Sequence, residues 1–174
     1  MRYYAALCVV AGLLPLVVIT VLSFLAKDFM LFENYISDLG VSDYAIVFNA
    51  SLVIAAILVV PFILRLGKGY NYLKPVFFLA AVTVACVGIF PSSDPVHWYV
   101  SAAFFILAFL TILLAGIKVR SKPSGAISIF LALLCFAGLL IFNPFIETLQ
   151  VYAIGLWIAA AGLLSKKIFS HRHQ

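Results

Sequence analysis

Charged residues are scarce in this sequence: Asp, Glu, Lys and Arg make up only 10% of its 174 residues. A soluble domain carries roughly 25% charged residues. A chain of this size keeps too much of its surface in water to hide a composition that is 66% hydrophobic. With a mean hydropathy of +1.23, the composition excludes a soluble enzyme, a disordered chain and a nucleic-acid-binding protein. It predicts an integral membrane protein whose partners are membrane lipids.

The motifs of common catalytic and binding sites are also missing. The sequence has no HExxH, CxxC or GxSxG motif, no phosphate-binding loop and no nucleotide fingerprint. Its three cysteines, Cys8, Cys86 and Cys135, fall in three separate apolar segments, which favours buried thiols over a disulfide. We therefore expect no cofactor and no bound metal.

Long apolar runs are what the sequence does contain. A helix needs about 17–25 apolar residues to cross a hydrocarbon core of about 30 Å, and these runs lack the alternation typical of membrane β-strands. We expect an all-α integral membrane protein, a single six-helix transmembrane domain over residues 1–174. The first run is too long for a signal peptide, so it is interpreted as a retained helix. The predicted spans are 4–26, 44–64, 73–90, 98–117, 126–142 and 148–164.

Basic and acidic residues fall on opposite sides of these spans. All but one of the 11 Lys and Arg residues lie on the side of the two termini: Arg2, Arg65, Lys68, Lys74, Lys118, Arg120, Lys122, Lys166, Lys167 and Arg172. On the other side are Lys27 and the 6 acids, namely Asp28, Glu33, Asp38, Asp43, Asp94 and Glu147. An excess of Lys and Arg marks the cytoplasmic side. The sequence therefore predicts a multi-pass plasma-membrane protein with both termini in the cytoplasm.

Two local patterns predict how the helices start and pack. Asp94 followed by Pro95 is typical of an N-cap with proline at the first helical position. Gly155, Ala159 and Gly162 lie on one face of the last span, and small residues allow helices in a membrane to approach closely.

Polar residues gather on the outward side. Asp38, His97 and Glu147 belong to three different outward connections, and polar residues lie deeper in the neighbouring spans: Asn49, Ser101 and Gln150. Polar groups in lipid cost several kcal/mol unless they have partners, and ionisable residues at membrane depth indicate a functional site. The pattern predicts a polar cavity open to the outside.

These residues suggest roles. His97, Asp38 and Glu147, with Ser37 as a nucleophile, are the catalytic candidates, because a histidine, an acid and a serine are the groups that acyl transfer needs. Asn49, Ser101 and Gln150 are the ligand-binding candidates. Asp38, His97 and Glu147 would also suit an open three-ligand metal shell, but one histidine without a paired spacing argues against it.

Each ionisable residue also has a structural interpretation. Asp38 can cap a turn, and Asp94 fits an N-cap best. Glu147 can complement the dipole at the start of the last helix. His97 at a helix N-terminus is expected to be neutral or paired with a carboxylate, that of Asp38 or Glu147.

Several motifs occur in an order that resembles a known family. They are Ile36-Ser37-Asp38-Leu39-Gly40, Phe48-Asn49, Gly88-Ile89-Phe90-Pro91 with His97, Glu147 and Trp157. Over nearly the whole chain they resemble the prokaryotic domain-of-unknown-function family 998. The first motif and the histidine are also similar to the eukaryotic DRAM and Sfk group, which includes autophagy modulators and a protein of GPI-anchor lipid remodelling.

The resemblance to the eukaryotic group is looser. That group has a Pro-Glu pair where this chain has Ser42-Asp43, so Asn49 carries over only to the prokaryotic family. The resemblance implies a six-helix fold and a connection with lipids, and it implies no reaction.

Three classes of function follow. The favoured one is lipid binding or lipid remodelling at the outer leaflet. The others are an intramembrane hydrolase that uses His97 with Asp38 or Glu147, and a non-enzymatic accessory or structural subunit. Whether the protein is an enzyme is left open by the sequence, and no protein partner is predicted. A transporter is disfavoured because no span is interrupted at the membrane midplane and no charged residue lies there.

Overall fold

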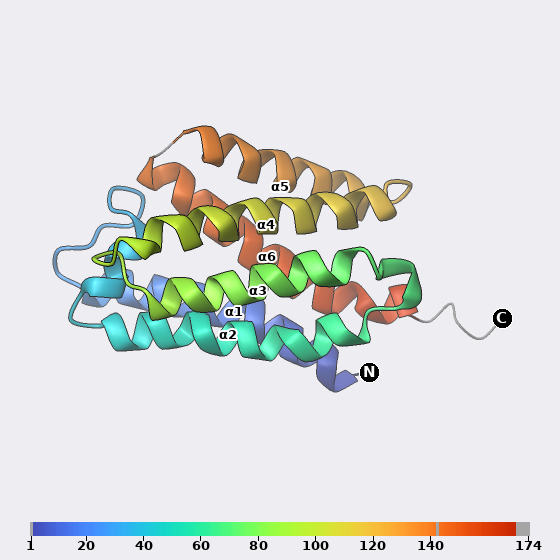
Figure 1. Cartoon of the computed structure of the whole chain (residues 1–174), viewed down its shortest axis with the longest axis horizontal. Coiled ribbons are helices and arrows are strands. Elements are labelled where there is room, and N and C mark those ends of the chain that lie inside the picture. Colours follow the sequence, from blue (N-terminus) through green and yellow to red (C-terminus); the bar gives the residue numbers. More distant parts are fainter. Residues whose placement is uncertain (1, 142, 170–174) are drawn as a thin grey trace.

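The computed structural model describes residues 2–141 and 143–169, and the side chains of 3–141 and 143–165. Within these residues all regular secondary structure is helical and there is no strand, which confirms the expected all-α fold (Figure 1). The elements are α1 (Arg2–Leu25), η1 (Ile36–Val41), α2 (Ala45–Arg65), η2 (Lys68–Tyr70), α3 (Leu73–Ile89), α4 (Val96–Lys118), α5 (Pro123–Leu140) and α6 (Pro144–Phe169).

Every predicted apolar segment is a helix. Five of the described helices, α1, α2, α4, α5 and α6, are long and apolar enough to cross a membrane, which indicates a membrane protein. The helix α3 is apolar but has only 17 residues. The predicted end of the fifth segment, Phe142, lies outside the described residues, as do the side chains of Arg2, Lys166 and Lys167 and the whole of Arg172.

The helix α6 starts at Pro144, earlier than the predicted residue 148. The Asn143 side chain accepts the backbone N–H of Phe145 at 2.8 Å and so caps the helix, while proline suits the first helical position because it needs no N–H partner there. The earlier start brings Glu147 into the first turn of α6. Glu147 therefore belongs to a helix rather than to a loop.

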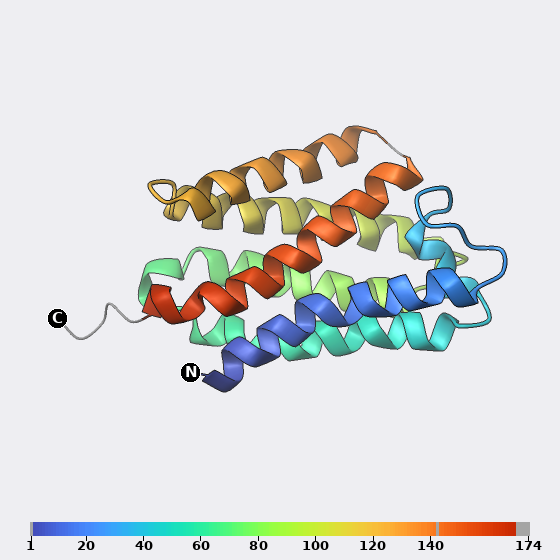
Figure 2. The same ribbon diagram turned by 180° about the vertical axis from the view of Figure 1, so that it is seen from behind.

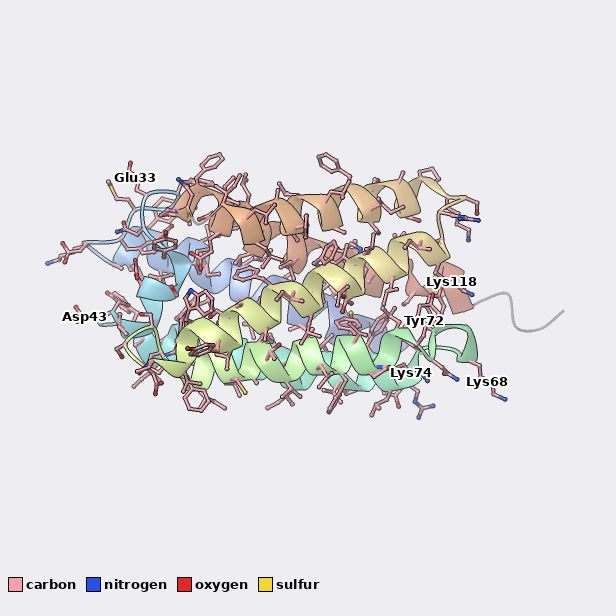
Figure 3. The ribbon with its side chains drawn as sticks, turned by 45° about the horizontal axis from the view of Figure 1, so that its top comes forward. Glu33, Asp43, Lys68, Tyr72, Lys74 and Lys118 are labelled. Atoms are coloured by element: carbon pink, nitrogen blue, oxygen red, sulfur yellow. The ribbon has the colours of Figure 1, made fainter. Side chains whose placement is uncertain are left out.

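The two ends of the bundle carry opposite charge (Figure 3). Glu33 and Asp43 lie at the end that holds η1 and the α3–α4 and α5–α6 connections, which we call the acidic end. Lys68, Lys74 and Lys118 lie at the other end, the basic end, together with η2 and the α4–α5 connection. The charge separation expected from the sequence is thus present in space for the described residues.

Sequential helices pack as neighbours from α1 to α5, and α6 then returns to pack on α1 rather than along α5. Glycines make this return possible. A Cβ on Gly155 would lie 2.8 Å from the carbonyl oxygen of Gly12, and one on Gly162 would lie 2.7 Å from that of Ala5. These backbones are in direct contact, which confirms the small-residue face predicted for the last span. The helices α5 and α6 meet near residue 143 and diverge toward the basic end (Figure 2).

Candidate functional site

The connection between α1 and α2 folds back over the acidic end. Its helical part, η1, buries Ile36, Leu39 and Gly40. Ile36 and Leu39 join Ile19 and Phe48 in one apolar cluster. We call η1, residues Ile36–Val41, the plug, because it covers the bundle with its own apolar side chains.

Two of the predicted site residues hold the plug by its backbone. Oε2 of Glu147 accepts the N–H of Ile36 at 2.8 Å, and the backbone of Ser37 hydrogen-bonds to the same carboxyl group. Nδ2 of Asn49 donates to the carbonyl oxygen of Gly40 at 3.1 Å. Glu147 and Asn49 therefore have structural roles that need no ligand, beyond the helix-dipole role expected for Glu147.

Two glycines allow the close packing around Asn49. A Cβ on Gly88 would lie 2.6 Å from the backbone oxygen of Asn49, and a Cβ on Gly40 would lie 3.0 Å from its Oδ1. That Oδ1 is buried without a hydrogen-bond partner among the described residues. Gly40 and Gly88, which belong to two of the motifs quoted above, therefore both allow α2, α3 and the plug to pack closely at Asn49.

Both ring nitrogens of His97 are engaged. Nδ1 lies 2.7 Å from the carbonyl oxygen of Phe90, and because a carbonyl only accepts, Nδ1 carries the hydrogen. In the neutral ring, Nε2 then accepts the hydroxyl of Ser101 at 3.2 Å. No carboxylate bonds to His97 in the described part of the chain. Of the two expectations for His97, direct pairing with Asp38 or Glu147 is not found among the described residues, because a main-chain carbonyl and a serine hold the ring instead.

Four polar residues of the acidic end line one cavity of about 100 Å³: Ser37, His97, Ser101 and Glu147. The other lining residues are apolar or glycine, come from α1, α2, α3, α4, α6 and the plug, and extend as deep as Val59 and Ile158. The cavity is thus polar at the acidic end and apolar toward the middle of the bundle.

The structure places Asp38 apart from this cavity. Asp38 is exposed and lines an open hollow of about 390 Å³ under the α1–α2 connection, with Asp28 and Asp43. Among the described residues, no three His, Cys, Asp or Glu side chains are placed to hold a metal ion. The alternative of a metal shell from Asp38, His97 and Glu147 is therefore wrong.

The ligand-binding candidates separate as well. Ser101 lines the cavity, whereas Asn49 and Gln150 do not. Nε2 of Gln150 donates to the carbonyl oxygen of Cys135 at 2.6 Å, which ties α6 to α5. The amide of Gln150 occupies the space above Gly138, where a Cβ would collide with it.

Sequence reasoning missed the main-chain groups of the site. The carbonyl oxygen of Phe90 orients the ring of His97. The backbone amide of Ile36 binds the carboxyl group of Glu147. A helix that ends before Pro91 leaves its last carbonyls without intrahelical partners. The position of Pro91 in the sequence could therefore have indicated that the carbonyl of Phe90 is free to bind a side chain. Asp94 does bond to the start of α4, because its Oδ1 accepts the N–H of Val96 at 2.8 Å. The predicted register is off by one residue, because Pro95 lies at the N-cap and Val96 is the first helical residue.

Comparison with known proteins identifies a family. A family model described as "Protein of unknown function (DUF998)" matches residues 9–164. The resemblance to the prokaryotic family is thereby confirmed, and the comparison does not address the eukaryotic group. Neither the curated proteins nor the solved structures gave a match.

Proposed function

The chain belongs to the DUF998 family of unknown function, and from that premise we propose that it binds a single lipid chain of the outer leaflet. In this proposal the protein spans the plasma membrane six times, with both termini in the cytoplasm. The observation that carries the proposal is the cavity lined by Ser37, His97, Ser101 and Glu147, which is polar at the acidic end and apolar below.

The helix α3 supports the sixth span. Its 17 residues extend about 25 Å at 1.5 Å per residue, close to the hydrocarbon thickness of about 30 Å. It packs between α2 and α4, which are both long enough to cross. An even number of spans puts both termini on one side, and the Lys and Arg residues of the basic end favour the cytoplasm for that side.

The size and chemistry of the cavity favour a narrow ligand with a neutral headgroup. Its volume of about 100 Å³ is below the roughly 300–1,000 Å³ of pockets for drug-sized ligands, so it suits part of one chain. The carboxyl group of Glu147 disfavours an anionic headgroup, and Ser37 contributes a hydroxyl group to the cavity wall. A glycerol hydroxyl is the matching chemistry, as in a monoacylglycerol.

A photoactivatable monoacylglycerol tests the proposal on the purified full chain. Ala55→Phe narrows the cavity, which Ala55 lines. Ala50→Phe makes the same change on the exposed face of α2 and serves as the control. We expect cross-linking to fall severalfold in Ala55→Phe and to persist in Ala50→Phe, with both variants folded by thermal melting. Equal cross-linking in the two variants, or none in the wild type, would overturn the proposal.

A second candidate function is ester hydrolysis, favoured by one contact. The hydroxyl of Ser101 lies 3.2 Å from Nε2 of His97, whose other nitrogen is held by Phe90. This is the nucleophile, base and orienting group that acyl transfer needs. Ser101 Oγ would attack the ester carbonyl while Nε2 takes its proton, and the ring would return that proton to the leaving alcohol, which leaves the acyl group on Ser101. A water molecule that gives a proton to Nε2 would then attack this acyl group, and the ring would return the proton to Ser101 Oγ as the fatty acid leaves.

The hydrolase candidate assigns the nucleophile to Ser101 rather than to Ser37. Ser101→Ala is expected to abolish release of fatty acid from monoacylglycerol while cross-linking persists, and Ser37→Ala is expected to keep turnover. Absence of turnover in the wild type would reject this candidate and leave lipid binding untouched.

A further inference from the structure

A larger cavity opens at the basic end, between α5 and α6. It has a volume of about 710 Å³. The two helices meet near residue 143 and diverge toward the basic end, while α5 stays packed on α4 (Figure 2). We call this cavity the basic-end groove. It shares no lining residue with the cavity at the acidic end.

The walls of the basic-end groove suit hydrocarbon. Most of its lining residues are apolar, among them Phe77, Leu131 and Leu164. Three polar side chains deep in the wall are already partnered: Nε1 of Trp157 donates to Ser128 Oγ at 2.9 Å, and Ser165 Oγ donates to the carbonyl oxygen of Gly162 at 2.6 Å. A chain of methylene groups would therefore find few unsatisfied polar atoms in these walls.

The rim of the groove is cationic. Lys122 lines it at the start of α5. Nζ of Lys118 lies 6.0 Å from the ring centre of Tyr70, which also lines the groove, and Arg120 is exposed between the two lysines. None of the 6 Asp and Glu residues of the sequence lies at this end, so no acidic side chain of the described residues neutralises the rim.

We propose that the basic-end groove binds one anionic phospholipid, with an acyl chain between α5 and α6 and the phosphate at Lys122. Basic pockets between membrane helices attract anionic headgroups, and the volume lies within the range of roughly 300–1,000 Å³ of ligand pockets. A second copy of the chain is the less favourable occupant, since two cationic rims would face each other. The proposal is independent of the lipid site at the acidic end.

Trp157 provides a direct readout, because it lines the groove and is one of only 2 tryptophans. In a Trp98→Phe variant it is the sole indole. The full chain is reconstituted in phosphatidylcholine vesicles containing a small fraction of brominated phosphatidylglycerol or, separately, brominated phosphatidylcholine. We expect the phosphatidylglycerol to quench Trp157 more strongly. In a Trp157→Phe variant, the exposed Trp98 should be quenched equally by both lipids.

Matched variants test the headgroup contact and the groove itself. Lys122→Gln should weaken the apparent affinity for phosphatidylglycerol about fivefold, whereas Lys68→Gln, exposed at the same end but outside the groove, should not. Ala160→Leu narrows the groove and should reduce quenching, whereas Ala126→Leu, exposed on α5 and outside the groove, should not.

Three results would overturn this proposal. They are equal quenching of Trp157 by the two lipids, equal effects within either pair of matched variants, and chemical cross-linking of two copies through the groove.

Discussion

Glu147 accepts the backbone N–H of Ile36 at 2.8 Å, although 111 residues separate them in the chain. The carboxylate at the start of α6 thus holds the plug between α1 and α2. The same carboxylate lines the cavity at the acidic end. Glu147 therefore both holds the plug over the acidic end of the bundle and contributes a carboxyl group to the candidate site.

Removing that anchor should loosen the plug. We expect Glu147→Ala to lower the free energy of unfolding by about 1–3 kcal/mol, the range for a buried polar group left without its hydrogen-bond partner, here the N–H of Ile36. Glu147→Gln keeps an acceptor oxygen and should cost less. Thermal melting in detergent measures both, with Glu33→Ala at an exposed position as the control. A melting temperature of Glu147→Ala equal to that of the control would contradict the structural role.

The contacts of His97 predict which substitutions are coupled. His97→Ala removes the hydrogen-bond partner of both the Phe90 carbonyl and the Ser101 hydroxyl. The losses of unfolding free energy in His97→Ala and Ser101→Ala should therefore be non-additive by more than about 0.5 kcal/mol. His97→Ala and Asp38→Asn should be additive within about that value, because Asp38 lies outside the cavity. Double-mutant cycles of unfolding free energy decide this. Coupling to Asp38 instead of Ser101 would show that the ring is held differently in solution.

The contact of α1 with α6 tolerates no added side chain. A Cβ on Gly155 would lie 2.8 Å from the side chain of Leu16 as well as from the Gly12 oxygen, and overpacking typically costs about 1–3 kcal/mol. We expect Gly155→Leu to reduce the yield of monodisperse protein and to lower its melting temperature. Gly69→Ala, at an exposed position with nothing nearer than 3.7 Å to its Cβ, should behave as the wild type.

The proposed orientation has a chemical test. In a variant with Cys8, Cys86 and Cys135 replaced by alanine, a thiol introduced by Glu33→Cys should react with an impermeant reagent added to intact cells. A thiol introduced by Lys122→Cys should react only after the membrane is permeabilised. The reverse labelling pattern would invert the topology and assign the acidic end to the cytoplasm.

The sequence predicted those parts of the fold that depend on local composition. The lengths of the apolar runs located the helices, the Asp94-Pro95 pair located a cap, and the small residues of α6 located a close contact. These features depend only on the residues of one helix and on its surroundings, so the periodicity and spacing of the sequence are enough to predict them.

The sequence did not predict contacts in which one partner is the main chain or comes from a distant segment. Glu147 binds an amide of the plug and His97 binds the carbonyl of Phe90, and every residue carries such groups, so no pattern marks them. The basic-end groove joins Tyr70 of η2, Lys122 of the α4–α5 connection and Trp157 of α6. Their proximity depends on the divergence of α5 and α6, a property of the packed bundle rather than of either helix.

The contact of α1 with α6 has a consequence for biosynthesis. Sγ of Cys8 donates to the carbonyl oxygen of Ile158, 150 residues later. At about 5–20 residues per second, roughly 8–30 seconds of translation separate the two partners. Throughout that time the face of α1 that carries Ala5, Cys8 and Gly12 remains without its native neighbour. A nascent chain stalled before α6 is thus an open bundle with a defined missing partner, which makes it a natural substrate for membrane quality control.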